Sequence, residues 1–70
     1  MDILAKRVVE LRTVKKVSRR EVSVRIGIVE RTYQRYENNE RDPDAPILKK
    51  ISDYYDVSAD YLLGRIDTPK

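Results

Sequence analysis

Apolar residues recur at helical spacing from the start of the chain. Leu4, Val8 and Leu11 stand at positions i, i+4 and i+7, so they share one stripe of a helix. We expect this first helix to cover residues 3–15. Asp2 lies just before the stripe and is a candidate N-cap, because its carboxylate can accept from the free amides of a helix start.

A capping pattern predicts a second, shorter helix over residues 19–26. Ser18 is followed three residues later by Glu21, which is the capping-box arrangement of a helix start. Apolar residues then continue at helical spacing up to Ile26. Gly27 follows, and glycine ends helices because it adopts positive φ without steric cost.

The stretch after Gly27 predicts a third helix, over residues 29–38. Val29, Tyr33 and Tyr36 fall on one side of it, and the tyrosines are expected to belong to the core. The other side carries four long polar side chains: Glu30, Arg31, Gln34 and Arg35. Such a strip can present hydrogen-bonding groups to a flat polar partner, although a solvated helix face has the same composition.

A fourth helix is expected after the loop at residues 38–43. Asp44 can cap it, and Pro46 falls in its first turn, where no hydrogen-bonded amide is lost. The apolar face of this helix consists of Ile47 or Leu48, Ile51 and Tyr55.

The last helix is the shortest. Ser58 can cap it, and we expect it to end at Leu63, before Gly64. Residues 65–70 then form a short, frayed tail. No alternating strand pattern occurs in the sequence, so the chain is predicted to be all-α, with a compact five-helix domain over residues 1–64.

Composition limits the chemistry that this domain can perform. The 70 residues include no cysteine and no histidine, which removes the thiolate metal ligands and the commonest general base. No phosphate-binding glycine loop is present. We therefore expect no enzyme activity, no metal and no cofactor. No apolar run approaches the roughly 20 residues of a membrane span, so no membrane partner is expected.

Charge is divided unevenly along the chain. The formal net charge is +3, but residues 1–41 carry a net +5 and residues 42–70 a net −2. A basic N-terminal part suits a polyanionic partner, although many soluble domains have one.

The second and third helices, joined by a short turn containing Gly27, form the helix-turn-helix pattern. In that motif the second helix of the pair lies in the major groove of DNA, and its N-terminal residues contact base edges. The polar strip of the third helix fits this placement.

These motifs together resemble the Cro and phage-repressor type of helix-turn-helix domain, often called the Xre family. The resemblance covers residues 4 to 64, with the family's spacings throughout. It rests on Leu4, Val8, Leu11 and Arg12, on Ser18, Glu21, Val22 and Gly27, on Thr32, Tyr33, Arg35, Tyr36 and Glu37, on Arg41 and Pro43, and on Leu48, Ile51, Tyr55, Val57, Ser58, Asp60, Leu62, Leu63 and Gly64.

The resemblance implies roles for the polar strip. Glu30, Arg31 and Arg35 match the positions that most often reach base edges, with Gln34 beside them. Arginine favours guanine O6 and N7, and a glutamate can accept from a cytosine amino group. Glu30 has an alternative role, since a carboxylate at a helix start also stabilises the helix dipole.

The resemblance also implies contacts to the DNA backbone from Arg19, Thr32, Asn38 and Arg41. Arg19 matches a position where the family often has a glutamine on a phosphate, and arginine adds charge there. Arg41 has the alternative of reaching the minor groove. Each of these residues can instead be an ordinary solvated side chain.

Other matching positions are expected to support the fold. Arg12 and Glu37 resemble a structural ion pair of the family. The chain departs from the family at Val29, where a capping Ser or Thr is usual, and at Asn39, where glycine is usual. Ser23 replaces the common alanine at the contact between the second and third helices.

The sequence thus predicts a cytoplasmic, bacterial or phage-encoded regulator of transcription, most simply a repressor, that binds a palindromic operator in double-stranded DNA. One short helix reads few base pairs, so a homodimer through the C-terminal helix is expected. Its candidate surface is Tyr61, Leu62, Arg65 and Ile66. The alternative is a protein-interaction module or antitoxin built on the same fold. No small-molecule ligand is indicated.

Overall fold

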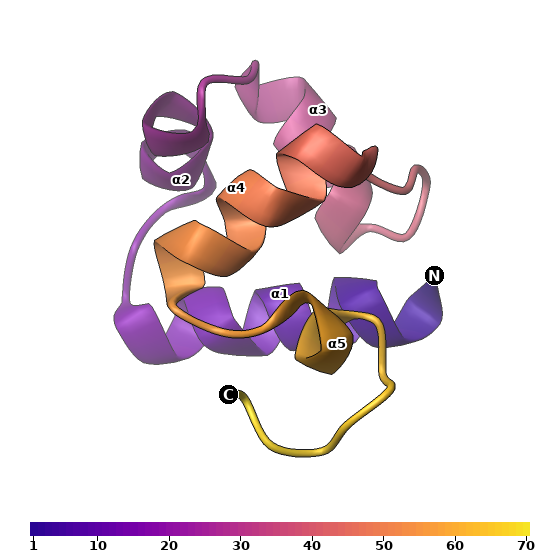
Figure 1. The fold of residues 1–70 in the computed structure, drawn as a ribbon. Coiled ribbons are helices and arrows are strands. Elements are labelled where there is room, and N and C mark those ends of the chain that lie inside the picture. Colours follow the sequence, from indigo (N-terminus) through magenta and orange to yellow (C-terminus); the bar gives the residue numbers. More distant parts are fainter.

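Five helices joined by short connections make up the protein (Figure 1). The computed structural model describes residues 1–70. The helices are α1 (Asp2–Lys15), α2 (Arg19–Ile26), α3 (Glu30–Glu37), α4 (Ala45–Tyr55) and α5 (Ala59–Leu62). Figure 1 shows α2 and α3 on one side of the molecule, α1 on the other and α4 crossing in front. The all-α prediction is confirmed. None of the helices is both long and apolar enough to cross a membrane.

Side chains at the helix starts explain three of the five boundaries. Ser18 Oγ accepts from the Glu21 amide at 3.0 Å, Asp44 Oδ1 accepts from the Ile47 amide at 3.0 Å, and Ser58 Oγ accepts from the Tyr61 amide at 3.1 Å. The predicted caps of α2, α4 and α5 are therefore confirmed.

The first boundary differs from its prediction. Asp2 lies inside the first turn of α1, whose N-cap is Met1, so the expected cap role of Asp2 is wrong. Its carboxylate instead accepts a hydrogen bond from the side chain of Asn39. Asn39 itself has φ 58°, the left-handed conformation expected of a residue just after a helix.

Two other helices are shorter than predicted. Helix α3 covers residues 30–37 instead of 29–38, because Val29 has the extended ψ of 144° and Asn38 is the C-cap. Helix α5 ends one residue early, at Leu62. Gly64 follows with φ 80°, and a Cβ added there would lie 3.0 Å from Cγ1 of Ile3, so glycine allows this turn to approach α1 closely.

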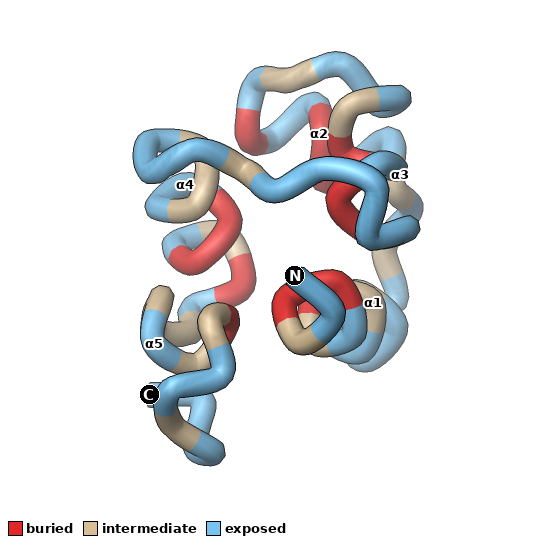
Figure 2. Tube along the Cα trace, turned by 90° about the vertical axis from the view of Figure 1, so that its right-hand side faces the viewer, coloured by how far each residue is buried: buried red, intermediate tan, exposed pale blue.

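A single apolar core holds the five helices together (Figure 2). Its nine buried residues come from every helix: Leu4, Val8, Val22, Ile26, Tyr33, Tyr36, Ile51, Tyr55 and Leu62. The hydroxyls of Tyr33 and Tyr55 satisfy each other at 2.7 Å inside this core. Burial raises the pKa of both phenols, that of Tyr55 to about 12. The prediction that Tyr33 and Tyr36 are core residues is confirmed.

The buried carboxylate of Glu37 joins three helices. Its side chain is 0% exposed and accepts from Arg12 Nε at 2.6 Å and from Arg19 Nε at 2.9 Å. Arg12 also donates to the carbonyl of Val17 at 3.1 Å, in the connection between α1 and α2. Burial alone would raise the pKa of Glu37, but the hydrogen bonds from Arg12 and Arg19 outweigh it and hold the pKa below its ordinary value.

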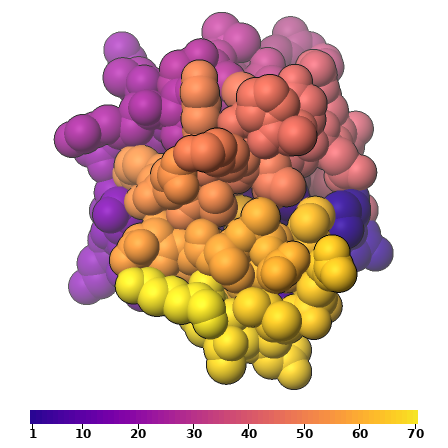
Figure 3. All heavy atoms as spheres, in the orientation of Figure 1, coloured from indigo at the N-terminus to yellow at the C-terminus, as the bar shows by residue number.

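The C-terminal tail folds back on the domain, contrary to the expectation that it is frayed. The Ser58 amide donates to the carbonyl of Pro69 at 2.7 Å, and Lys70 pairs with Asp56 at 2.7 Å. Arg7 donates to the carbonyls of Tyr61 and Ile66. Figure 3 shows the yellow tail lying against the lower surface of the molecule.

One residue of the predicted dimer surface belongs to the core. Leu62 is 0% exposed, so its assignment to that surface is wrong. Tyr61 is half-buried, with the Arg7 guanidinium 4.1 Å from its ring centroid. Consecutive residues of a one-turn helix face different directions, and only some of them can remain outside.

Acidification is expected to destabilise the fold through Glu37. Its pKa in the folded state lies below the ordinary 4.5, so the unfolded carboxylate binds a proton more readily. The stabilisation is complete above about pH 5 and is lost as the pH falls through the folded-state pKa. Urea unfolding followed by circular dichroism between neutral pH and about pH 3 measures this loss.

The Glu37→Gln variant should lower the free energy of unfolding at neutral pH by about 2 kcal/mol, because charge-assisted hydrogen bonds are lost. Its further decrease below pH 5 should be shallower than that of the wild type. Glu40→Gln removes an exposed carboxylate and is the control that should keep the wild-type pH profile. An unchanged acid decrease in Glu37→Gln would contradict this assignment.

Candidate nucleic-acid interface

Helix α3 separates its buried and exposed residues sharply. Tyr33 and Tyr36 are 0% and 3% exposed and anchor the helix on the core. The four polar residues of the predicted strip, Glu30, Arg31, Gln34 and Arg35, are all exposed. A helix of eight residues is not stable alone, so its tyrosines hold the polar side outward.

Four predicted contact residues meet in one shallow hollow. Arg31, Gln34, Arg35 and Asn38 line a space of about 150 Å³ together with Glu40, and no apolar residue lines it. Glu30 and Thr32 lie outside this hollow; Glu30 is exposed at the helix start, and Thr32 is half-buried. The structure therefore brings together some of the residues predicted to contact bases and one of those predicted to contact the DNA backbone.

Glu40 is a member of the hollow that the sequence did not indicate. Its amide donates to the carbonyl of Arg35 at 2.9 Å, so the chain turns back over the end of α3. Asn39, with its positive φ, produces this reversal. The sequence offers one signal, an asparagine where glycine is usual, because asparagine adopts positive φ more readily than most residues. That tendency does not show where the next side chain lies.

The turn before α3 places Val29 outside the core. Gly27 has φ 78°, and its amide donates to the carbonyl of Ser23 at 2.9 Å. Ile28 then packs against the core, whereas Val29 is 70% exposed. The expectation that Val29 shares the buried side of Tyr33 is wrong, because its extended backbone removes it from the helical stripe. Val29 forms no side-chain cap, as predicted.

The arginines on this surface form no ion pair within the chain. Arg31, Arg35 and Arg41 are exposed, and none of them takes part in any of the chain's seven ion pairs. An arginine without an internal partner has all its N–H donors available to an anion. The surface therefore has the donors that recognition of phosphates or guanine edges requires.

Arg19 both binds the buried Glu37 and reaches the surface. Its Nε donates to Glu37, yet its side chain is still 38% exposed. The Arg12–Glu37 pair that the sequence predicted is confirmed, while the participation of Arg19 in it was missed. Arginine has five N–H donors, so Arg19 keeps others for a partner outside the protein.

The loop that carries Arg41 is fastened to the start of α1. The amino group of Met1 donates to Asn39 Oδ1 at 2.8 Å and forms an ion pair with Asp42. These contacts bracket Arg41 on both sides. Asn38, the C-cap of α3, is exposed next to this loop.

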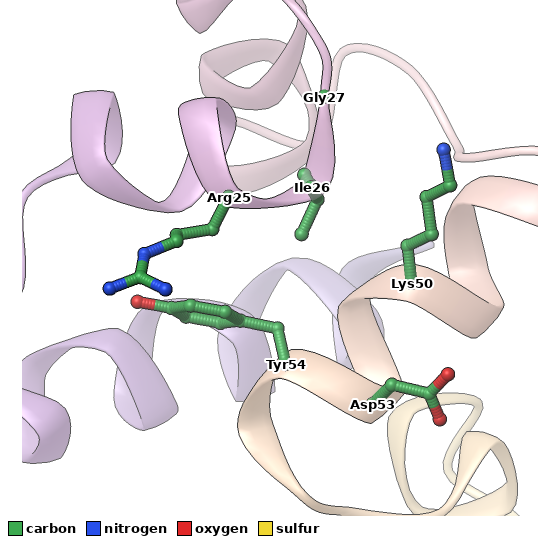
Figure 4. Close-up of a pocket in the computed structure, with 6 residues that line it drawn as sticks. All are labelled: Arg25, Ile26, Gly27, Lys50, Asp53 and Tyr54. Carbon is green, nitrogen blue, oxygen red and sulfur yellow. The ribbon is translucent and has the colours of Figure 1, made fainter.

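A larger hollow of about 490 Å³ lies between the end of α2 and α4 (Figure 4). Arg25 extends over the hydroxyl end of the Tyr54 ring, and Lys50 projects from α4 across from Gly27. Asp53, also in its lining, pairs with Lys49 at 2.9 Å. No group of three or more side chains that could hold a metal ion occurs in the structure.

Comparison with known proteins agrees with this geometry. A family described as helix-turn-helix matches residues 9–62. The HTH-type transcriptional regulator ImmR of Bacillus subtilis (strain 168) is 37% identical over 67 residues, which cover 96% of this chain and 53% of that protein. The uncharacterized HTH-type transcriptional regulator YobD of the same organism is 35% identical over 60 residues, covering 86% and 54% respectively. No solved structure matches the chain.

The family match extends over most of the sequence and includes the whole of α2, the turn and α3. The chain spans about half the length of the two relatives named above. The chain belongs to the helix-turn-helix family.

Proposed function

We propose that this helix-turn-helix protein binds double-stranded DNA sequence-specifically and regulates transcription, with α3 in the major groove. The observation that carries the proposal is the exposed strip of α3, whose Arg31 and Arg35 have no ion-pair partner and line an all-polar hollow. The major groove is about 12 Å wide and admits one helix, and its base edges display acceptors for such donors.

Different residues of the polar strip contact different bases in this proposal. Arg31 and Arg35 donate to O6 and N7 of guanine, and Gln34, in the same hollow, assists them. Glu30 lies apart at the helix start, where it accepts from a cytosine amino group or stabilises the helix dipole.

Backbone contacts from residues around the strip fix the protein on the duplex. Arg41 and Asn38 approach a phosphate from the loop after α3, and Thr32 from the helix itself. Arg19 uses the N–H groups that Glu37 leaves free. These contacts supply affinity, whereas the base contacts supply sequence preference.

Regulation follows from occupancy. A protein seated on an operator excludes other proteins from the same DNA, so repression is the simplest outcome for a domain of this size. The names of two similar proteins, both HTH-type transcriptional regulators, support a role in the regulation of transcription. We propose that the protein acts in the cytoplasm and is bacterial or phage-encoded.

We propose further that two copies bind a palindromic operator. One helix of eight residues reads few base pairs, and half-sites one helical turn apart require two protomers. The pairing surface consists of the parts of α5 and the tail that remain accessible, around Tyr61, Arg65 and Ile66.

A second candidate function is a protein-interaction module. The hollow between α2 and α4 favours it, because neither Arg25 nor Lys50 in its lining forms an ion pair. Binding of a random-sequence duplex at low salt separates the two functions. The DNA reader binds it, and a module that docks only on proteins does not.

The affinity for DNA is expected to depend strongly on salt. Each phosphate neutralised releases counterions, so log K should fall linearly with log salt concentration, with a slope of about −0.9 per phosphate. Fluorescence anisotropy of a labelled duplex between about 50 and 200 mM salt measures the slope. Arg41→Ala should make it shallower by about 1. An affinity independent of salt would count against DNA binding.

Substitutions at Arg35 and Arg19 should have different effects on binding. Arg35→Ala is expected to relax the preference at one base pair by about 1–3 kcal/mol, since a bidentate guanine contact is lost. Arg19→Ala should weaken binding to selected and random duplexes by the same factor. Arg20→Ala, at an exposed neighbour without an ion pair, is the control for loss of charge alone, because Arg19→Ala also loses its bond to Glu37. Competition assays with both duplexes measure these effects, and identical behaviour of the two variants would refute the division of roles.

Sedimentation velocity with a selected palindromic duplex should show two protomers per DNA molecule. Arg65→Glu reverses a charge that is 74% exposed, so it should weaken the pairing without unfolding the domain. A single protomer on the wild-type complex at saturating protein would contradict the dimer.

A further inference from the structure

Val29 has neither of the two roles that would explain a valine at its position. It is the N-cap of α3, where Ser, Thr, Asp or Asn would satisfy a free amide, and it forms no such bond. The side chain is also 70% exposed, and it is not among the apolar residues that pack against the core. Neither helix capping nor core packing therefore accounts for a valine at this position.

The other exposed valines do not combine these features. Val24 is also 70% exposed and Val14 is 80% exposed, but both lie within helices, where a single exposed valine is ordinary. Val29 stands immediately before the polar strip that starts at Glu30. Positions where local rules fail without a folding benefit are expected to be functional.

The position of Val29 at the start of α3 determines which groups of the DNA it can contact. In a helix-turn-helix complex the N-terminal residues of the second helix approach the base edges. The major groove has one apolar group at those edges, the C5-methyl of thymine; the others are hydrogen-bond donors and acceptors. The thymine methyl is therefore the base-edge group that best matches an exposed isopropyl group.

We propose that Val29 contacts the methyl group of a thymine and makes the protein prefer a T·A base pair at that position. The inference rests on the proposed DNA binding and adds to it a specificity-determining residue with a stated base. Arg31, Gln34 and Arg35 supply the polar part of the recognition, and Val29 supplies an apolar part that no hydrogen bond provides. The expected contribution is that of one methyl group removed from water.

Replacement of thymine by deoxyuridine tests the contact directly. Deoxyuridine keeps the base pair and the O4 acceptor and lacks only the methyl group. Duplexes recovered by selection from a random-sequence pool are remade with deoxyuridine at single thymine positions. The wild type should bind one such substitution in each half-site about fourfold more weakly, and the others should have little effect.

The variants separate this contact from changes in folding. Val29→Ser should bind the thymine and deoxyuridine duplexes equally well, and its thermal midpoint should rise by several degrees because serine caps α3. Val24→Ser replaces an equally exposed valine elsewhere and should keep the wild-type preference for thymine.

Two results would overturn the inference. In the first, the wild type binds the selected duplexes selectively, but no change of thymine to deoxyuridine weakens the binding. DNA binding would then stand without the Val29 contact. The other is a Val29→Ser variant that retains the full preference for thymine. Failure to recover any duplex would refute DNA binding itself and this inference with it.

Discussion

The buried carboxylate of Glu37 is the constraint on which the arrangement of the helices depends. A charge with 0% exposure requires compensation, and it receives it from Arg12 in α1 and Arg19 in α2. Glu37 itself ends α3, so one carboxylate fixes the relative positions of three helices. Removing Glu37 would leave both arginines without this partner, and removing one arginine would leave the buried carboxylate with a single cation. The triad therefore constrains the geometry more strictly than apolar packing does.

The apolar core also holds α3 in place. Tyr33 and Tyr36 are buried and attach α3 to the other helices, and the Tyr33 hydroxyl is hydrogen-bonded to that of Tyr55 in α4. Together with Glu37, these residues fill the inner side of α3. The outer side has no part in holding the domain together, so its side chains are free to serve a partner.

Much of the fold could be predicted because local chemistry determines it. Ser18, Asp44 and Ser58 could be recognised as caps from their residue types. The spacing of apolar residues identified the helices between them. Contacts between segments that are far apart in the sequence were harder to predict. The sharing of Glu37 by Arg19 and the docking of the tail by Arg7 depend on distances between segments far apart in sequence. All four residues of the polar strip could be predicted from the sequence. The place of Glu40 and the exposure of Val29 could not, because each depends on the backbone conformation of a turn.

The separation of the two sides of α3 gives the domain freedom to diverge. Glu30, Arg31, Gln34 and Arg35 are exposed and take part in no internal ion pair, so substitutions there leave the anchoring residues untouched. Exposed positions of this kind tolerate replacement with little change in stability. The same scaffold can thus be retargeted, by gene duplication in nature or by library screening in the laboratory, through exchange of a few codons and without a new solution to the folding problem.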